Sequence, residues 1–350
     1  MATECCGEDS SISAFSQSHI DSHRKTIKIP NAGGIKLASG IASWGRHGMD
    51  VQRCGTTWVV HAPAKLNLFF EVHGRREDGY HLVETLVCPI SLFDTLLFEE
   101  SADGDLVLTV EFITEGASLR DCGFDTVPDG PTNLIYRAAR LIQEETGTFR
   151  GAKVRLLKRI PTGAGLGGGS SDAAAALKGL CCLWGLNPGM EKMASWAARL
   201  GSDVPLFLEG GACVCRGRGE IIERIAEFTR LDVVVVKPPV SLSTASVYAA
   251  CRVPQTPRSI QPALNAWTKG DMTKLSEGMF NRLEEAAERL APTVRNLGDR
   301  LRQTNCLGTS MTGSGSCYFA LYRHRKQAIA VARKLRAEKL GAVFVVHTVA

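Results

Sequence analysis

The run from Pro161 to Ser171 is the part of the sequence best equipped to bind a charged ligand. Five of its residues are glycine, a strand-like segment precedes it and an alanine-rich segment follows it. Because glycine has no Cβ, several backbone N–H groups of such a run can converge on one anion. The helix expected behind the run adds unpaired N–H groups and the positive end of its dipole, and Ser170 and Ser171 add hydroxyl donors or a helix cap. The spacing therefore predicts a binding site for phosphate groups.

Three interpretations of the glycine run compete. The plainest is a flexible turn before a capped helix. The second is a dinucleotide-binding fold, because Gly163, Gly165 and Gly168 satisfy Gly-x-Gly-x-x-Gly, but that motif alone is weak and here it follows several strands without crossover helices. A Walker P-loop is excluded, since no Gly-Lys-Ser or Gly-Lys-Thr ends the run. We favour the third interpretation, a loop of another architecture that binds a nucleoside triphosphate.

Strand-like segments dominate the chain around this run. Alternating apolar residues predict strands over 58–62, 66–72, 82–88, 95–99, 106–113 and 153–160. The predicted helices are 133–145 with Thr132 as N-cap, 171–183, and a third with Asn187 as N-cap that ends before Gly201. Several strands before the first helix are typical of an α+β domain and not of a doubly wound parallel sheet.

The last third of the chain predicts a second, smaller layer. Strands are expected over 231–236, 317–322 and 342–347, and helices over 281–290, 294–302 and 324–339. This order suits a ferredoxin-like layer of helices on one sheet. Residues 1–56 have no lasting apolar period, so we expect a disordered extension there, followed by domains over 57–225 and 226–350.

The composition excludes several classes of protein. Of the 350 residues, 44% are hydrophobic and 22% charged, as in ordinary globular proteins, and the formal net charge of +5 is too small to argue for nucleic acid. No apolar run approaches the ~20 residues that span a bilayer. The 12 cysteines contain no Cys-x-x-Cys pair and predict reduced thiols in a cytoplasmic protein. We expect no nucleic-acid and no membrane partner.

Segments on both sides of the glycine run carry a family resemblance. Residues 62–68 read Ala-Pro-Ala-Lys-Leu-Asn-Leu, and residues 74–81 read Gly-Arg-Arg-Glu-Asp-Gly-Tyr-His. Residues 201–205 read Gly-Ser-Asp-Val-Pro, and residues 311–316 read Met-Thr-Gly-Ser-Gly-Ser. With the glycine run, these motifs resemble the GHMP kinase superfamily, and most of all its 4-diphosphocytidyl-2-C-methyl-D-erythritol kinases.

The resemblance implies a fold and a reaction. It implies an α+β, two-domain GHMP kinase fold, with an N-terminal domain like domain 2 of ribosomal protein S5 and a ferredoxin-like C-terminal domain. It also implies an enzyme that uses ATP and Mg²⁺ to phosphorylate the 2-hydroxyl of 4-diphosphocytidyl-2-C-methyl-D-erythritol, in the non-mevalonate route to isoprenoids. We expect a monomer or weak homodimer that acts on a small molecule. The rival functions are another GHMP kinase, of the homoserine or mevalonate type, and a catalytically silent binding protein of this fold.

The resemblance further implies the catalytic and acceptor-binding residues. Lys65 and Asp203 match the catalytic lysine and aspartate, although a solvated strand lysine and a helix N-cap are the ordinary interpretations of these two residues. Asn67 lies on the same strand face as Lys65 and can bind a substrate hydroxyl. Tyr80 and His81 match the pair that receives the cytosine ring, where the alternative is a half-buried surface turn.

The ATP site implied by the resemblance is built mainly from the glycine run. Its members are Pro161, Gly163, Gly165, Leu166, Gly167, Gly168, Gly169, Ser170 and Ser171, with Asn133 and Lys158. Asn133 can instead cap a helix, and Lys158 can be a solvated lysine at the end of a strand. Asp172 can reach Mg²⁺ through water or merely suit the helix dipole, so the metal ligands stay unassigned. Residues 313–315 can contact the other domain or form a simple β-turn.

Overall fold

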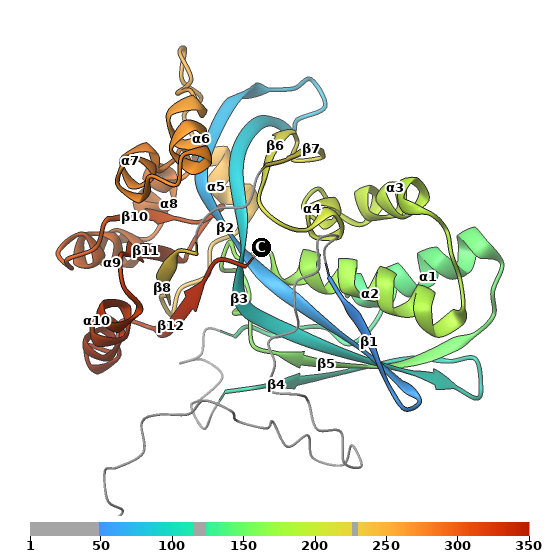
Figure 1. Cartoon of the computed structure of the whole chain (residues 1–350). Helices are drawn as coiled ribbons and strands as arrows, with labels where there is room; N and C mark the ends of the chain where they lie inside the picture. Colours follow the sequence, from blue (N-terminus) through green and yellow to red (C-terminus); the bar gives the residue numbers. More distant parts are fainter. Residues whose placement is uncertain (1–48, 115–123, 226–229, 350) are drawn as a thin grey trace, which may run out of the picture. The chain divides into compact units, whose positions relative to one another are not determined.

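Two long antiparallel strands, β2 (Thr57–Arg75) and β3 (His81–Ser101), form the centre of the fold (Figure 1). The computed structural model describes residues 49–114, 124–225 and 230–349, all within one compact unit that spans 42–350. The sequence predicted these strands as shorter pieces. They continue because the register shifts at bulges, the first between Pro63 and Ala64, and a bulge lets a strand bend without ending.

The first sheet contains eight strands in the described part of the chain, with the order β1-β2-β3-β5-β4 and three further strands beside it. Besides β2 and β3 these are β1 (Val51–Cys54), β4 (Leu106–Phe112), β5 (Gly151–Lys158), β6 (Cys213–Gly217), β7 (Ile221–Arg224) and β9 (Phe280–Asn281). β9 comes from far along the chain and pairs in parallel with β2. Arg282, just after β9, donates two hydrogen bonds of 2.7 Å to the buried carboxylate of Glu71 in β2.

Four helices follow or interrupt the first sheet and lie together in Figure 1: α1 (Leu134–Thr146), α2 (Gly168–Trp184), α3 (Met190–Leu200) and α4 (Val204–Glu209). Their starts differ from the prediction. Asn133, and not Thr132, caps α1, through a 2.8 Å bond from the Ile135 N–H to its Oδ1. α3 begins at Met190, so Asn187 does not cap it. α2 begins at Gly168 instead of residue 171, because the last glycines of the run already form its first turn.

Within the described ranges, the second sheet has four antiparallel strands in the order β10-β11-β8-β12. They are β8 (Asp232–Lys237), β10 (Gly308–Met311), β11 (Tyr318–Tyr322) and β12 (Ala342–His347). The sequence predicted three of these strands and missed β10. Its helices are α5 (Thr244–Ala250), α6 (Gln261–Thr268), α7 (Met272–Gly278), α8 (Glu284–Leu290), α9 (Pro292–Arg302) and α10 (Arg325–Ala337).

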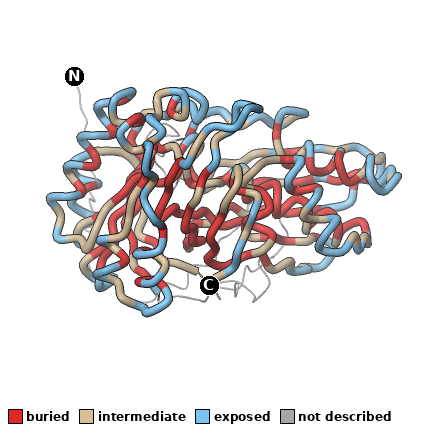
Figure 2. Tube along the Cα trace, turned by 90° about the horizontal axis from the view of Figure 1, so that it is seen from above, coloured by how far each residue is buried: buried red, intermediate tan, exposed pale blue. Residues whose placement is uncertain are grey.

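Two helices near this sheet also begin elsewhere than predicted. The helix expected from residue 281 begins at Glu284, because Phe280 and Asn281 pair with β2. The helix expected from residue 294 begins at Pro292, where a missing N–H costs nothing in the first helical turn. Figure 2 shows buried positions gathered in the interior and exposed positions at the rim. The strands β2 and β8 and the helix α2 are mostly buried. The α+β fold class is confirmed.

The predicted extension over 1–56 is only partly testable. Residues 1–48 lie outside the described residues, but its last residues are folded, because Val51–Cys54 pair with β2 and Met49 is buried. The boundary predicted between residues 225 and 226 meets the segment 226–229, which also lies outside the described residues. The division into two domains therefore stays a prediction.

Candidate active site

A cavity of about 1290 Å³ brings together the motifs that the sequence singled out. Its wall includes the glycine run, the turn before β3, the residues around Asp203 and the turn that follows β10. The predicted site residues in this wall are Lys65, Asn67, Tyr80, His81, Asn133, Lys158, Pro161, Gly163, Gly165, Leu166, Gly167, Gly168, Gly169, Ser170 and Asp203. Ser171 is the exception: it is fully buried outside the wall, and its hydroxyl has no hydrogen-bond partner among the described residues. This placement argues against the predicted contact of Ser171 with ATP.

The glycine run presents its backbone to the cavity. Gly163, Gly165 and Gly167 adopt φ angles of 56°, 72° and 72°, in the left-handed region that other residues rarely occupy. Gly167 is the N-cap residue of α2, and no side chain caps the helix. The first N–H groups of a helix have no partner within it, so those of α2 are available to a ligand. The 17-residue helix α2 begins here and adds the positive end of its dipole, which suits the phosphate groups that the sequence predicts at this run.

The turn after β10 packs directly against the glycine run. A Cβ at Gly165 would lie 2.0 Å from the carbonyl oxygen of Thr312, so the two backbones touch at this point. The Cys317 N–H donates to the carbonyl of Ala164 at 3.3 Å. Within the turn, the Gly315 N–H donates to the carbonyl of Thr312 at 3.0 Å. The segment 313–315 is thus a β-turn that also contacts the glycine run. The predicted contact between two domains depends on the domain division and stays a prediction.

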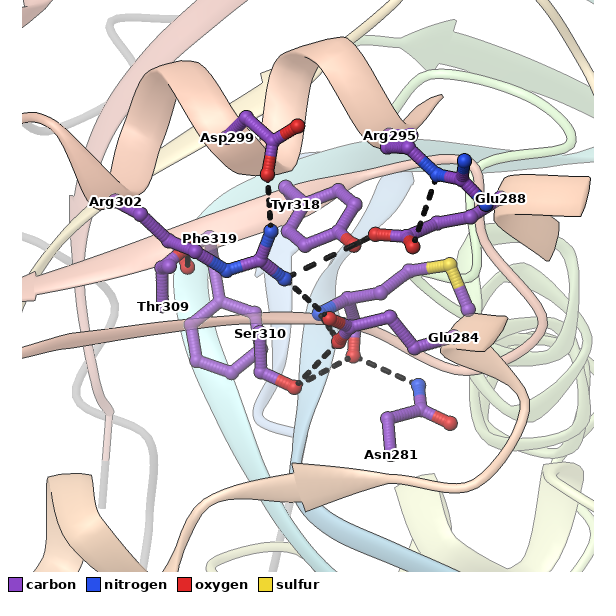
Figure 3. A network of polar contacts seen from close by, with 11 residues as sticks. Asn281, Glu284, Glu288, Arg295, Asp299, Arg302, Thr309, Ser310, Tyr318 and Phe319 are labelled. Atoms are coloured by element: carbon purple, nitrogen blue, oxygen red, sulfur yellow. Dashed lines mark hydrogen bonds and ion pairs between the residues drawn. The ribbon is translucent and has the colours of Figure 1, made fainter. Parts of the chain in front are cut away.

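A polar network behind this turn fixes its position (Figure 3). Asn281 donates from Nδ2 to the carbonyls of Met311 and Gly313, both at 2.8 Å. Glu284 accepts the Met311 N–H at 3.1 Å and the Arg302 guanidinium at 2.7 Å. Burial raises the pKa of Glu284, while the Met311 N–H and Arg302 oppose that shift. Side chains near β9 and α8 therefore hold the backbone that meets the glycine run.

Lys65 lies in β2 with its side chain almost fully buried. Its Nζ donates to Asn67 Oδ1, and Asn67 Nδ2 donates to the Thr85 hydroxyl at 2.8 Å. The Asn67 N–H donates to Thr312 Oγ1 at 3.1 Å, which links the lysine to the turn after β10. Burial lowers the pKa of Lys65, and the nearby Asp203 carboxylate partly offsets this shift. Lys65 is therefore not the solvated strand lysine of the ordinary interpretation.

Asp203 lies directly before α4 and in the wall of the cavity. It occupies the N-cap position, but its side chain makes no capping hydrogen bond and its backbone is helical. The capping alternative is therefore wrong for its carboxylate. The position is fixed by the packing of α4, in which Val204–Leu208 are all buried. The carboxylate and the Lys65 ammonium form a charge couple in one cavity.

Lys158 is buried between two carboxylates. Its Nζ pairs with Asp94 Oδ2 and, at 2.7 Å, with Asp172 Oδ2. Asp94 Oδ1 also accepts the N–H groups of Arg159 and Ile160, at 2.6 and 2.8 Å. The carboxylates raise the pKa of Lys158 although burial opposes them, so the ammonium stays charged. Lys158 thus ties the end of β5 to the first turn of α2, and its predicted contact with ATP phosphates stays a prediction.

Another part of the cavity wall is aromatic and more exposed. The rings of His81 and of Tyr248 in α5 are tilted by 35° to each other, with centroids 5.0 Å apart. The Arg218 guanidinium lies over the ring of Tyr80, 5.0 Å from its centroid. Burial, assisted by Arg75, lowers the pKa of His81, which favours the neutral form of its imidazole. The half-buried turn predicted as the alternative is therefore real, but it opens into the site.

Several functional side chains were missed by sequence reasoning. Tyr248 and Arg218 line the cavity, Thr312 touches Asn67, and Asp94 neutralises Lys158. Thr312 stood inside a motif that the sequence had singled out, so its position was the available signal. The other three stand in segments without a motif, and only tertiary pairing reveals them. Asn133 both caps α1 and lines the cavity, so its capping interpretation holds without excluding a ligand contact.

The residues present fit a magnesium ion that arrives with a nucleotide. Among the described residues, no three His, Cys, Asp or Glu side chains gather as a metal site. Mg²⁺, however, usually keeps several waters and is held by one or two carboxylates with substrate phosphates. Asp172 lines the cavity beside the glycine run, and its buried Oδ1 has no hydrogen-bond partner among the described residues. Burial raises the pKa of Asp172 while Lys158 opposes that shift, so this acceptor suits a hydrated cation only when the carboxyl group is ionised.

Two family models match the chain. The model described as the GHMP kinases N terminal domain matches residues 133–211, and the model described as GHMP kinases C terminal matches residues 260–340.

The described helices of the chain include none long and apolar enough to cross a membrane.

Curated relatives and solved structures agree with these models. The 4-diphosphocytidyl-2-C-methyl-D-erythritol kinase of Pelotomaculum thermopropionicum is 40% identical over 79% of this chain and 92% of its own. That of Alkaliphilus metalliredigens is 36% identical over 76% and 88%. A crystal structure of 4-(cytidine 5'-diphospho)-2C-methyl-D-erythritol kinase superposes with a TM-score of 0.68 at 35% identity, over 83% of this chain and 99% of that one.

More distant structures share the fold alone. The homoserine kinase from Cytophaga hutchinsonii superposes with a TM-score of 0.63 at 18% identity, over 85% of this chain and 96% of its own. An identity of 18% shows a shared fold and says nothing about the acceptor. Identities of 36–40% over most of both chains, in contrast, show the family. The chain belongs to the 4-diphosphocytidyl-2-C-methyl-D-erythritol kinase family of the GHMP kinases.

Proposed function

We propose that this chain transfers the γ-phosphoryl group of ATP to the 2-hydroxyl of 4-diphosphocytidyl-2-C-methyl-D-erythritol. The observation that carries the proposal is the set of groups that line one cavity. Its wall combines the glycine run at the start of α2, the aromatic side chains Tyr80, His81 and Tyr248, and the pair Lys65 and Asp203. Such a wall suits a triphosphate on the glycine run and a nucleobase among the aromatic rings.

In this reaction the acceptor oxygen attacks the γ-phosphorus of ATP, and the bond to the β–γ bridging oxygen breaks to release ADP. Asp203 accepts the proton of the attacking hydroxyl, since its carboxylate is free of any capping bond. Lys65 stabilises negative charge on the phosphoryl oxygens, and Asn67 holds its ammonium in place. The predicted hydrogen bond from Asn67 to a substrate hydroxyl stays a prediction, and its Oδ1 already accepts from Lys65.

The triphosphate is held by the backbone of the glycine run, with Asn133 at the nucleoside side and Lys158 behind the loop. A Mg²⁺ ion would be held through Asp172 and would neutralise charge on the phosphate oxygens. The proposal further states that the chain acts in the cytoplasm, on a small molecule and without nucleic acid. Its active form is a monomer or a weak homodimer. The free cysteines among the described residues support a reducing compartment.

The test is ADP release measured by a coupled assay with ATP, Mg²⁺ and one acceptor at a time. We expect turnover with 4-diphosphocytidyl-2-C-methyl-D-erythritol and only the acceptor-free background with homoserine or mevalonate. Turnover confined to homoserine or mevalonate would support the rival kinase function. ADP release at background level with every acceptor would support a silent binding protein.

A further inference from the structure

Arg218 lies in the cavity wall beside Tyr80, one residue before a glycine that backs onto Asp203. Its guanidinium lies 5.0 Å from the centroid of the Tyr80 ring, and its side chain is 33% exposed in the cavity wall. The next residue, Gly219, backs onto the catalytic group, because a Cβ there would lie 3.7 Å from Asp203 Oδ1. Arg218 and Gly219 thus lie beside two residues of the proposed site. Tyr80 is proposed to bind the base, and Asp203 is proposed to accept the hydroxyl proton.

The guanidinium of Arg218 also has donors to spare. Lys158, in the same cavity, is saturated by two carboxylates, and Lys65 donates to Asn67. Arg218 pairs with Glu220, whose carboxylate lies 3.6 Å from Arg218 Nε, and its charge also helps to lower the pKa of the exposed Asp78. Its two terminal nitrogens make no hydrogen bond within the described part of the chain. A planar fork of this kind is suited to bind two phosphate oxygens at once.

The chemistry of the acceptor supplies a matching group. In a nucleoside-diphosphate-linked alcohol, the diphosphate lies between the base and the alcohol. With the base at Tyr80 and the hydroxyl at Asp203, that diphosphate faces Arg218. We propose that Arg218 binds the diphosphate of the acceptor and makes the site selective for nucleoside-diphosphate-linked alcohols over free alcohols. This inference rests on the proposed function.

Stacking alone would explain the contact between Arg218 and Tyr80 but makes a different prediction. If Arg218 only supports the aromatic ring, its replacement weakens every cytidine compound by the same factor. If it binds the diphosphate, replacement weakens cytidine diphosphate and leaves cytidine unaffected. The ratio of the two dissociation constants therefore separates the two roles without any turnover.

The experiment measures calorimetric binding of cytidine and of cytidine diphosphate, with a non-hydrolysable ATP analogue and Mg²⁺ saturating the glycine run. For the unmodified chain we expect cytidine diphosphate to bind at least about tenfold tighter than cytidine. Arg218→Met keeps an apolar side chain against Tyr80 but has no hydrogen-bond donors. We expect its affinities for cytidine diphosphate and cytidine to differ by no more than about twofold. Arg218→Lys, with one point charge, is expected to lie in between.

Arg216→Met is the matched control, two residues earlier. Arg216 pairs with Glu84 at 2.8 Å and with Glu223 at 2.7 Å and does not line the cavity, so the preference of this variant should equal that of the unmodified chain. An unchanged preference in Arg218→Met, or an equal loss for both compounds, overturns the inference and leaves the proposed function intact. Binding of neither compound by the unmodified chain overturns both.

Discussion

Two parts of the cavity wall, the donor end proposed to bind ATP and the acceptor end proposed to bind the cytidine compound, are built in different ways. The donor end is one contiguous run of backbone, packed so closely that a Cβ at Gly165 would collide with the carbonyl of Thr312. The acceptor end consists of side chains from separate segments, and Tyr80 is 52% exposed. Under the proposed function, backbone groups bind ATP and side chains select the acceptor. Substitutions are therefore expected to act through steric collision at the donor end and through loss of contact at the acceptor end.

The largest expected effect is at the proposed base. Asp203→Asn removes the proton acceptor but keeps the shape of the side chain, so kcat is expected to fall by roughly 10²–10⁴-fold. ATP affinity should change little, because the glycine run and α2 are untouched. Rapid-quench turnover and equilibrium binding of an ATP analogue measure the two quantities.

Asp271→Asn is the control for this change. Asp271 caps α7 through a 3.0 Å bond from the Lys274 N–H, does not line the main cavity, and asparagine caps equally well. Its kcat is expected to match that of the unmodified chain. If Asp203→Asn retained more than a tenth of the kcat, Asp203 would not be the base.

A smaller effect is expected when an added side chain collides with the backbone at the donor end. Gly165→Ala places a Cβ 2.0 Å from the Thr312 carbonyl oxygen at a φ of 72°, so the glycine run and the turn after β10 must separate. We expect a loss of about 2–4 kcal/mol in the free energy of unfolding and a higher KM for ATP. Urea unfolding monitored by circular dichroism gives the first quantity.

Gly169→Ala is the stability control within the same run. Its Cβ would meet nothing closer than Leu134 Cδ1 at 4.0 Å, and it lies in the first turn of a helix. We expect its free energy of unfolding to change by less than about 1 kcal/mol. Equal destabilisation by the two alanines would contradict the close approach at Gly165.

The smallest expected effect is on the pH dependence. Burial lowers the pKa of Lys65 although Asp203 opposes it, and the charged ammonium is the form that stabilises the phosphoryl group. The active form is present below that pKa and is lost as the pH rises through it. The alkaline decline of kcat should therefore begin below the ordinary lysine value of 10.5. A kcat that stays constant up to that value, in a chain still folded by circular dichroism, would show that Lys65 is not the titrating group.

The fold was largely predictable because most elements bury a regular apolar pattern. The strand over 231–236, for example, lies within one residue of β8. Errors arose where tertiary contacts override local preference. Glycine disfavours helices, so the start of α2 was placed three residues late, although packing of Gly168 against Ile160 fixes it there. β10 is a short run without alternation that becomes a strand only beside β11.

The parts of the site that consist of residues adjacent in the chain were easier to predict than the parts that folding brings together. The glycine run binds through backbone groups next to each other in the chain, so its composition alone indicated phosphate. The functions of Lys65 and Asp203 came only through the family resemblance, because a single lysine or aspartate has many ordinary uses. The sequence did not reveal Asp94, Arg218 and Tyr248. Each of them contacts a partner more than 60 residues away in the chain, and only the folded structure brings the two together.

The most direct test of the account is a crystal structure of the chain with a non-hydrolysable ATP analogue and cytidine diphosphate bound together. We predict the triphosphate on the N–H groups of residues 163–170, with its terminal phosphate beside Lys65 and Asp203. The cytosine ring should lie among Tyr80, His81 and Tyr248, with the diphosphate against Arg218. A triphosphate bound at the aromatic end, or a glycine run without phosphate, would contradict the account.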